Sequence, residues 1–189
     1  MQPAQFDRRI AITGGIAEGK STVMAMIREA GYPVQDADAL ARHVADQPDV
    51  RAEIAARLGL EADFTRDDLR RAVAQDPGAR ETLNALIHPR VRALLRASGP
   101  GFHEVPLLYE AGMEGDYDAV WVVMCGEAEQ RRRLAARGMD PALMQVILAA
   151  QWPTSQKAQR ANAVIRTDHP IESVREEVLA RLRALSNAA

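Results

Sequence analysis

The segment that most constrains the fold lies near the N-terminus, where residues 13–23 read TGGIAEGKSTV. Residues 14–21 match the pattern G-x-x-x-x-G-K-[S/T], a tight loop that turns its backbone N–H groups toward phosphate oxygens. The β-branched run RRIAIT precedes the loop, and Val23, Met24 and Ile27 follow it at helical spacing. Together they predict a buried strand, a phosphate-binding loop and a helix, in that order.

The loop is expected to hold the phosphates of a nucleotide, chiefly through its backbone. Lys20 is expected to bridge the β- and γ-phosphates, and the hydroxyl of Ser21 to bind Mg²⁺. The helix that begins near Lys20 adds the positive end of its dipole to the same place. The expected nucleotide-binding residues of the loop are Gly14, Gly15, Ile16, Ala17, Glu18, Gly19, Lys20, Ser21 and Thr22.

A carboxylate, that of Glu18, stands in the middle of this expected anion site. Because the loop holds phosphate through backbone N–H groups, side chains at its variable positions can point elsewhere. We therefore predict that the Glu18 carboxylate points away from the phosphates, toward an arginine such as Arg133 or Arg137.

The rest of the chain alternates short strands with helices. Residues 39–97 are an exception, because they are helical throughout, with breaks at Pro48, Gly59 and the turn 76–78. The alternation predicts an α/β fold, a three-layer core of P-loop kinase type with a parallel sheet, a helical insertion and a short helical lid. Further strands are expected at 32–38, 101–108, 117–125 and 163–166, and further helices at 127–137, 141–151 and 171–185.

Composition and charge indicate the number of domains and the kinds of partner to expect. Its 189 residues suit one domain with an inserted subdomain, and a net charge of −2 gives no bulk attraction to nucleic acid or anionic membrane. The single cysteine, Cys125, cannot form an internal disulfide, and neither a signal-peptide pattern nor a membrane-spanning apolar run is present. We expect a cytoplasmic monomer or weak homo-oligomer with no nucleic-acid or membrane partner.

Three classes of phosphate-loop protein compete. A GTPase requires an Asn-Lys-x-Asp motif, but lysine occurs only at positions 20 and 157, outside such a context. A motor ATPase requires an acidic residue at the end of a hydrophobic strand, whereas AVWVVMC ends in Met124 and Cys125. A kinase for a small molecule is therefore favoured.

Such a kinase needs a group near the acceptor hydroxyl and cations around the transferred phosphoryl group. In DADALAR, residues 36–42, Asp38 could accept the proton of the hydroxyl and Asp36 could hold Mg²⁺ through water. The alternative is that one of these aspartates caps a helix beginning at Ala39. Arg133 and Arg137 share one helix face and could close over the phosphates, although a solvated basic face is the alternative.

At this point the chain resembles the dephospho-CoA kinase family over nearly its whole length. ITGGIAEGKSTV is similar to the family's loop T-G-G-I-G-S-G-K-S, and DADALAR to its Asp-Ala-Asp-x-x-Ala-Arg element. LNALIHPRV resembles its His-Pro segment, VPLLYE its Pro-Leu-Leu-x-Glu turn, and ILAAQ with Lys157 its Gln…Lys segment. The chain departs from the family at Ala17-Glu18, where Gly-Ser is usual, and at residues 162–167, near the nucleotide base in related kinases.

The resemblance implies that ATP and Mg²⁺ phosphorylate the ribose 3′-hydroxyl of dephospho-CoA. It also implies a nucleotide-binding core at 1–45 and 99–189, with a lid at about 127–150, and an acceptor-binding insertion at 46–98. Asp38 is then the base, Lys20 and Arg133 stabilise the transferred phosphoryl group, and Arg137 contacts the nucleotide. The acceptor side is formed by Arg42, His88, Leu107, Leu108 and Glu110.

Several alternatives remain open at this point. The chain could be a kinase for another nucleotide or small hydroxyl compound, or a regulatory protein that hydrolyses ATP slowly. Arg166, at the altered segment, could pair with an acid or stack on adenine. Lys157 could have a functional role or stand there by chance.

Overall fold

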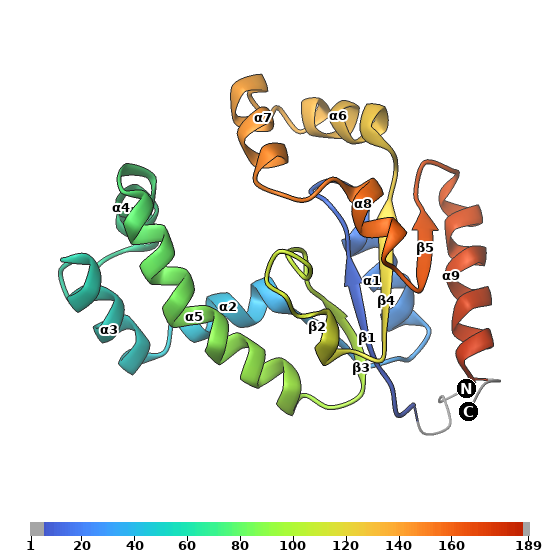
Figure 1. Ribbon diagram of the computed structural model, residues 1–189, viewed down its shortest axis with the longest axis horizontal. Coiled ribbons are helices and arrows are strands. Elements are labelled where there is room, and N and C mark those ends of the chain that lie inside the picture. The colour runs from blue at the N-terminus through green and yellow to red at the C-terminus, as the bar shows by residue number, and fades with distance from the viewer. Residues whose placement is uncertain (1–5, 187–189) are drawn as a thin grey trace. The chain divides into compact units, whose positions relative to one another are not determined.

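The computed structural model describes residues 6–186, and its sheet is parallel throughout (Figure 1). The strand order is β2-β3-β1-β4-β5, which confirms the predicted α/β class. The strands are β1 (Arg9–Thr13), β2 (Val34–Asp36), β3 (Gly101–Glu104), β4 (Ala119–Met124) and β5 (Ala163–Arg166).

Alternate residues of β1 pack against helices on one face of the sheet. Ile10 and Ile12 of β1 lie in the same buried apolar cluster as Val23 of α1 and Val178 of α9. Figure 1 shows α1 behind the sheet and α8 in front of β4, so helices cover both faces. The helices are α1 (Lys20–Glu29), α6 (Glu127–Ala136), α7 (Pro141–Ala149), α8 (Thr154–Gln159) and α9 (Ile171–Ser186), and a 3₁₀ turn spans Glu114–Asp116.

Parallel register brings the predicted site residues to one edge of the sheet. The loop begins directly after β1, and Asp36 ends β2. Both Ile12 and Asp36 pair with Glu104 of β3, which runs between the two strands. Since neighbouring strands are about 4.8 Å apart, Asp36 lies about 10 Å from β1, at the same level.

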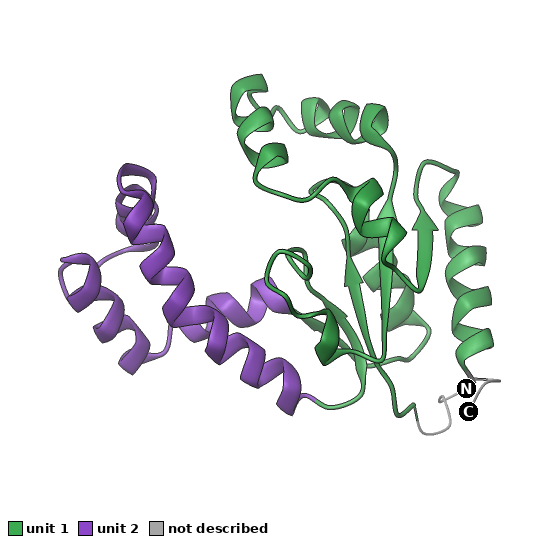
Figure 2. Ribbon diagram, in the orientation of Figure 1, with its two compact units in different colours: residues 1–36, 99–189 green, residues 37–98 purple. Residues whose placement is uncertain are grey.

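Residues 37–98 form a second compact unit (Figure 2). In it α5 packs against three other helices, around buried residues such as Val44, Ile54, Leu86 and Val91. The unit begins at Ala37 instead of the expected residue 46, because α2 packs on α5. Its helices are α2 (Ala37–Ala45), α3 (Pro48–Leu58), α4 (Arg66–Gln75) and α5 (Pro77–Ala97).

The helices differ from the expected ones in two main respects. The helix predicted to begin at Ala39 begins at Ala37, so Asp38 lies in its first turn and does not cap it. The short helix α8 was not predicted, because its six residues carry no apolar periodicity. Within residues 6–186, every helix is too short or too polar to cross a membrane.

Candidate functional site: the phosphate loop and its surroundings

The shape of the loop depends on two glycines and one alanine. A β-carbon at Gly14 would lie 2.3 Å from the carbonyl oxygen of Val123, so no larger residue fits there. Gly19 has φ 95°, which glycine adopts readily. Ala17 has φ 60°, a left-handed conformation that costs a non-glycine residue about 1–2 kcal/mol. Its methyl group packs with Leu134 and Met144, which offsets part of that cost.

Several backbone donors of the loop have no acceptor within the described residues. In the described part of the chain, the N–H groups of Ala17, Glu18, Gly19 and Ser21 donate to no protein acceptor. They stand at the N-terminus of α1, where the helix dipole favours an anion. The buried side chain of Lys20 lies at the same place and donates to the carbonyl oxygen of Gly15 over 2.8 Å. This arrangement fits the phosphates of a nucleotide.

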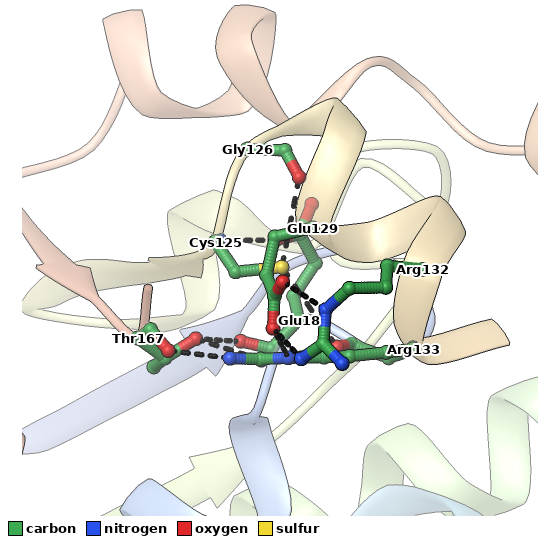
Figure 3. Close-up of polar contacts among 8 residues, drawn as sticks. Glu18, Cys125, Gly126, Glu129, Arg132, Arg133 and Thr167 are labelled. Carbon is green, nitrogen blue, oxygen red and sulfur yellow. Dashed lines mark hydrogen bonds and ion pairs between the residues drawn. The ribbon is translucent and has the colours of Figure 1, made fainter. Parts of the chain in front are cut away.

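Glu18 has a partner that the sequence did not reveal (Figure 3). Its side chain is 2% exposed, and its carboxylate accepts the backbone N–H of Cys125, directly after β4. The predicted arginine partner is therefore wrong, because the nearest donor is a backbone group from a neighbouring strand. Burial, and then the adjacent Glu18 carboxylate, raises the pKa of the Cys125 thiol to about 12. The thiol stays protonated at neutral pH and is a poor nucleophile.

Arg133 bridges the loop to the turn after β5 (Figure 3). Its Nη1 atom donates to the carbonyl oxygen of Ala17 over 3.4 Å and to the Thr167 hydroxyl over 3.1 Å, and its Nη2 atom donates to the Thr167 carbonyl. Its Nε atom donates to Glu129 over 2.8 Å. The guanidinium is thus held by protein acceptors. Arg137, at the end of α6, is exposed and makes no ion pair within the described residues.

Arg166 and Thr167 occupy the segment that departs from the family pattern. Arg166 pairs with Asp168 over 2.6 Å, which is the first of the two alternatives left open for it. The Thr167 hydroxyl donates to the carbonyl oxygen of Glu18 over 2.7 Å. The segment therefore supports the loop directly, a role that its altered sequence did not suggest.

Predicted acceptor residues differ in their exposure. Leu107 is 39% exposed, whereas Leu108 is fully buried and packs inside its unit. In the second unit, Asp38 and Arg42 are exposed on α2 and His88 is exposed on α5. A cavity of ≈ 190 Å³ in that unit is lined by Ala45, Phe64 and Leu69, by Asp46, which pairs with Arg66, and by the arginines Arg42, Arg51, Arg66 and Arg70.

Lys157 of α8 holds the turn after β3 in place. It is fully buried, and its Nζ atom lies 2.8 Å from Glu110 Oε1 and 3.0 Å from the carbonyl oxygen of Pro106. The same Pro106 oxygen accepts the hydroxyl of Thr13, the last residue before the loop. Glu110 Oε1 also accepts the backbone N–H of Trp152 over 2.8 Å. Lys157 and Glu110 thus join α8 to the turn after β3.

Lys157→Ala is expected to lower the free energy of unfolding by about 3–5 kcal/mol, because it leaves the Glu110 carboxylate buried without its cation. Urea unfolding followed by circular dichroism measures this loss. The paired replacement Lys157→Met with Glu110→Leu removes both charges and should recover most of the stability. A loss below about 1 kcal/mol in the single variant would show that the pair is not structural.

Three side chains at the loop were not predicted as site residues. Gln130, Gln151 and Thr154 form hydrogen bonds with the backbone of Gly15 and Ile16. Only Gln151 had a signal in the sequence, as part of the segment that resembles the family's Gln…Lys element. Gln130 and Thr154 bond to backbone atoms, and every residue has such atoms. No particular residue type in the loop therefore signals them in the sequence.

Comparison with known proteins identifies the family. The sequence profile of the dephospho-CoA kinases matches residues 8–173. A dephospho-CoA kinase of Anaeromyxobacter dehalogenans is 44% identical over 174 residues, covering 84% of this chain and 82% of the relative. That of Geobacillus kaustophilus is 38% identical over 190 residues, covering 92% and 94%.

Solved structures share the fold of this chain. A crystal structure of a Thermus thermophilus protein, 33% identical, has a TM-score of 0.80 and covers 96% of this chain and 99% of its own. A dephospho-CoA kinase from Campylobacter jejuni, 22% identical, has a TM-score of 0.71, covering 95% and 98%. A shikimate kinase from Bacteroides thetaiotaomicron, 16% identical, has a TM-score of 0.57, covering 93% and 98%, and shares the fold. With the profile and relatives matching most of its length, this chain belongs to the dephospho-CoA kinase family.

Proposed function

We propose that this protein transfers the γ-phosphoryl group of ATP to the ribose 3′-hydroxyl of dephospho-CoA, giving coenzyme A and ADP. The observation that carries the proposal is the loop at residues 14–22, with open N–H groups and a buried lysine, in a chain of this family. The fold of this chain has a parallel sheet, and in such folds ligands bind at the carboxyl ends of the strands.

The donor side is built from the loop. The open N–H groups between Ala17 and Ser21 take up phosphate oxygens, and the Lys20 ammonium offsets charge on the β- and γ-phosphates. Mg²⁺ would be held by the Ser21 hydroxyl and, through water, by Asp36, since this ion accepts few protein oxygens and keeps several waters. When bound with ATP, it neutralises charge that develops during transfer.

The acceptor side is assigned to the second unit. Asp38 accepts the proton of the attacking hydroxyl, and its exposure on the first turn of α2 leaves it accessible to substrate. The arginine-lined cavity there offers positive charge to the diphosphate of dephospho-CoA. Arg42 is the member of that lining that the family pattern also assigns to the acceptor.

Arg133 and Arg137 have different proposed roles. Arg133 holds the loop and the turn after β5 together, as its contacts to Ala17 and Thr167 suggest. Arg137 has no such contacts among the described residues and is the cation assigned to the transferred phosphoryl group. The resemblance implied a direct role for Arg133 at the transferred phosphoryl group, and this division is our alternative to that role.

ADP release measured with and without dephospho-CoA tests the proposal. We expect release to depend on dephospho-CoA and to remain at background with other nucleotides or simple alcohols. Dependence on a different acceptor would make the protein another small-molecule kinase. Release that no acceptor stimulates would make it a slow ATP-hydrolysing protein instead.

A further inference from the structure

The first part of the phosphate loop is held by side chains from outside it. Thr154 Oγ1 accepts the N–H of Gly15 over 3.2 Å, and Gln151 Oε1 accepts the N–H of Ile16 over 3.1 Å. Gln130 Nε2 donates to the carbonyl oxygen of Ile16 over 2.8 Å. We call Gln130, Gln151 and Thr154 the clasp.

The clasp divides the loop into two parts. The N–H groups of Gly15 and Ile16 are occupied by clasp oxygens, whereas those of Ala17, Glu18 and Gly19 have no acceptor in the described part of the chain. An N–H group held by a side chain is not available to a phosphate oxygen. The clasp therefore fixes the part of the loop that leads into the open anion-binding part.

A β-carbon at Gly15 would force the clasp side chains to move. A β-carbon at this position would lie 2.7 Å from Gln130 Nε2 and 2.9 Å from Thr154 Oγ1. The two side chains therefore approach the backbone as closely as glycine allows. Without Thr154, the N–H of Gly15 would lose a hydrogen bond to a side chain.

The clasp also connects the loop to both ends of the α6–α7 segment. Gln130 belongs to α6, while Gln151 and Thr154 follow α7. Between them, Leu134 and Met144 pack on the methyl group of Ala17. The segment expected to act as a lid is thus attached to the loop at its start and at its end.

We propose that Gln130, Gln151 and Thr154 are positioning residues that set the shape of the phosphate loop for nucleotide binding. They act through the backbone of Gly15 and Ile16. The inference rests on the proposed function only in that the loop binds nucleotide, and the identity of the acceptor does not enter it. If the clasp instead blocked the loop, so that a nucleotide had to displace it, removing the clasp would raise the affinity for nucleotide.

Titration calorimetry with Mg-ADP tests the clasp directly. Thr154→Val keeps the shape of the side chain and removes the acceptor, so we expect about fivefold weaker binding, as for the loss of one hydrogen bond. Adding Gln151→Met should bring the loss to about 20-fold. Thr154→Ser restores the hydroxyl and should bind within about twofold of the wild type. Ser155→Ala, which removes an exposed hydroxyl one residue away, is the matched control.

Enzyme kinetics distinguish a role in shaping the loop from a general loss of activity. With dephospho-CoA as acceptor, the KM for ATP of Thr154→Val should rise by the factor found in calorimetry, while kcat at saturating ATP stays within about twofold. Unchanged or tighter binding of Mg-ADP to a folded Thr154→Val protein would overturn the proposal. If that variant does not fold, Gln151→Met alone decides, because its half-buried side chain loses only one acceptor. A wild-type protein that binds Mg-ADP but phosphorylates no acceptor would count against the proposed function and leave the clasp testable.

Discussion

Lys20→Ala is expected to lower kcat/KM for ATP by about 10³-fold or more, because the charge that faces the β- and γ-phosphates is lost. The Lys20 ammonium is buried beside the open loop donors, where water screens its charge poorly. The measurement is a coupled ADP assay at saturating dephospho-CoA.

Two controls accompany Lys20→Ala. Arg28→Ala removes a cation from the exposed last turn of the same helix and should keep wild-type turnover. Thermal unfolding must show that Lys20→Ala remains folded, since the side chain also holds the carbonyl of Gly15. Full activity in this variant would exclude the loop as the phosphate donor site.

Asp38→Asn is expected to lower kcat by about 10²-fold or more, because asparagine cannot accept the proton of the attacking hydroxyl. The two side chains have nearly the same shape, and Asp38 is exposed on the first turn of α2, so the fold should persist. The readout is kcat at saturating ATP and dephospho-CoA.

Asp49→Asn is the matched control for this substitution. Asp49 is an exposed aspartate in the first turn of α3, in the same unit as Asp38. Its replacement removes a charge of the same kind and should leave kcat unchanged. Near-wild-type turnover in Asp38→Asn would remove Asp38 from the role of base.

The strands and the loop could be predicted because their signals are local. Gly14 and Gly19 occupy positions where a side chain collides or the backbone is left-handed, so the motif carries the geometry within it. The start of α2 was misplaced by two residues, because Ala37 and Asp38 suit a helical first turn as well as a strand end.

The contacts around the loop could not be predicted, because they join residues far apart in the chain. Glu18 meets the N–H of Cys125, 107 positions later, and that donor is present in any sequence. Lys157 was recognised as unusual, but only the fold shows that it is fully buried against Glu110. Arg133 was predicted on α6, but its acceptors at Ala17 and Thr167 depend on tertiary packing.

The most direct measurement is the identity of the product formed from Mg-ATP and dephospho-CoA by the purified protein. Mass spectrometry should show a product heavier by one phosphoryl group, formed in equal amount to ADP. Phosphorus NMR should place the new phosphomonoester on the ribose 3′ carbon. ADP without a phosphorylated product, or a phosphate at another position, would contradict the assignment of this protein as a dephospho-CoA kinase.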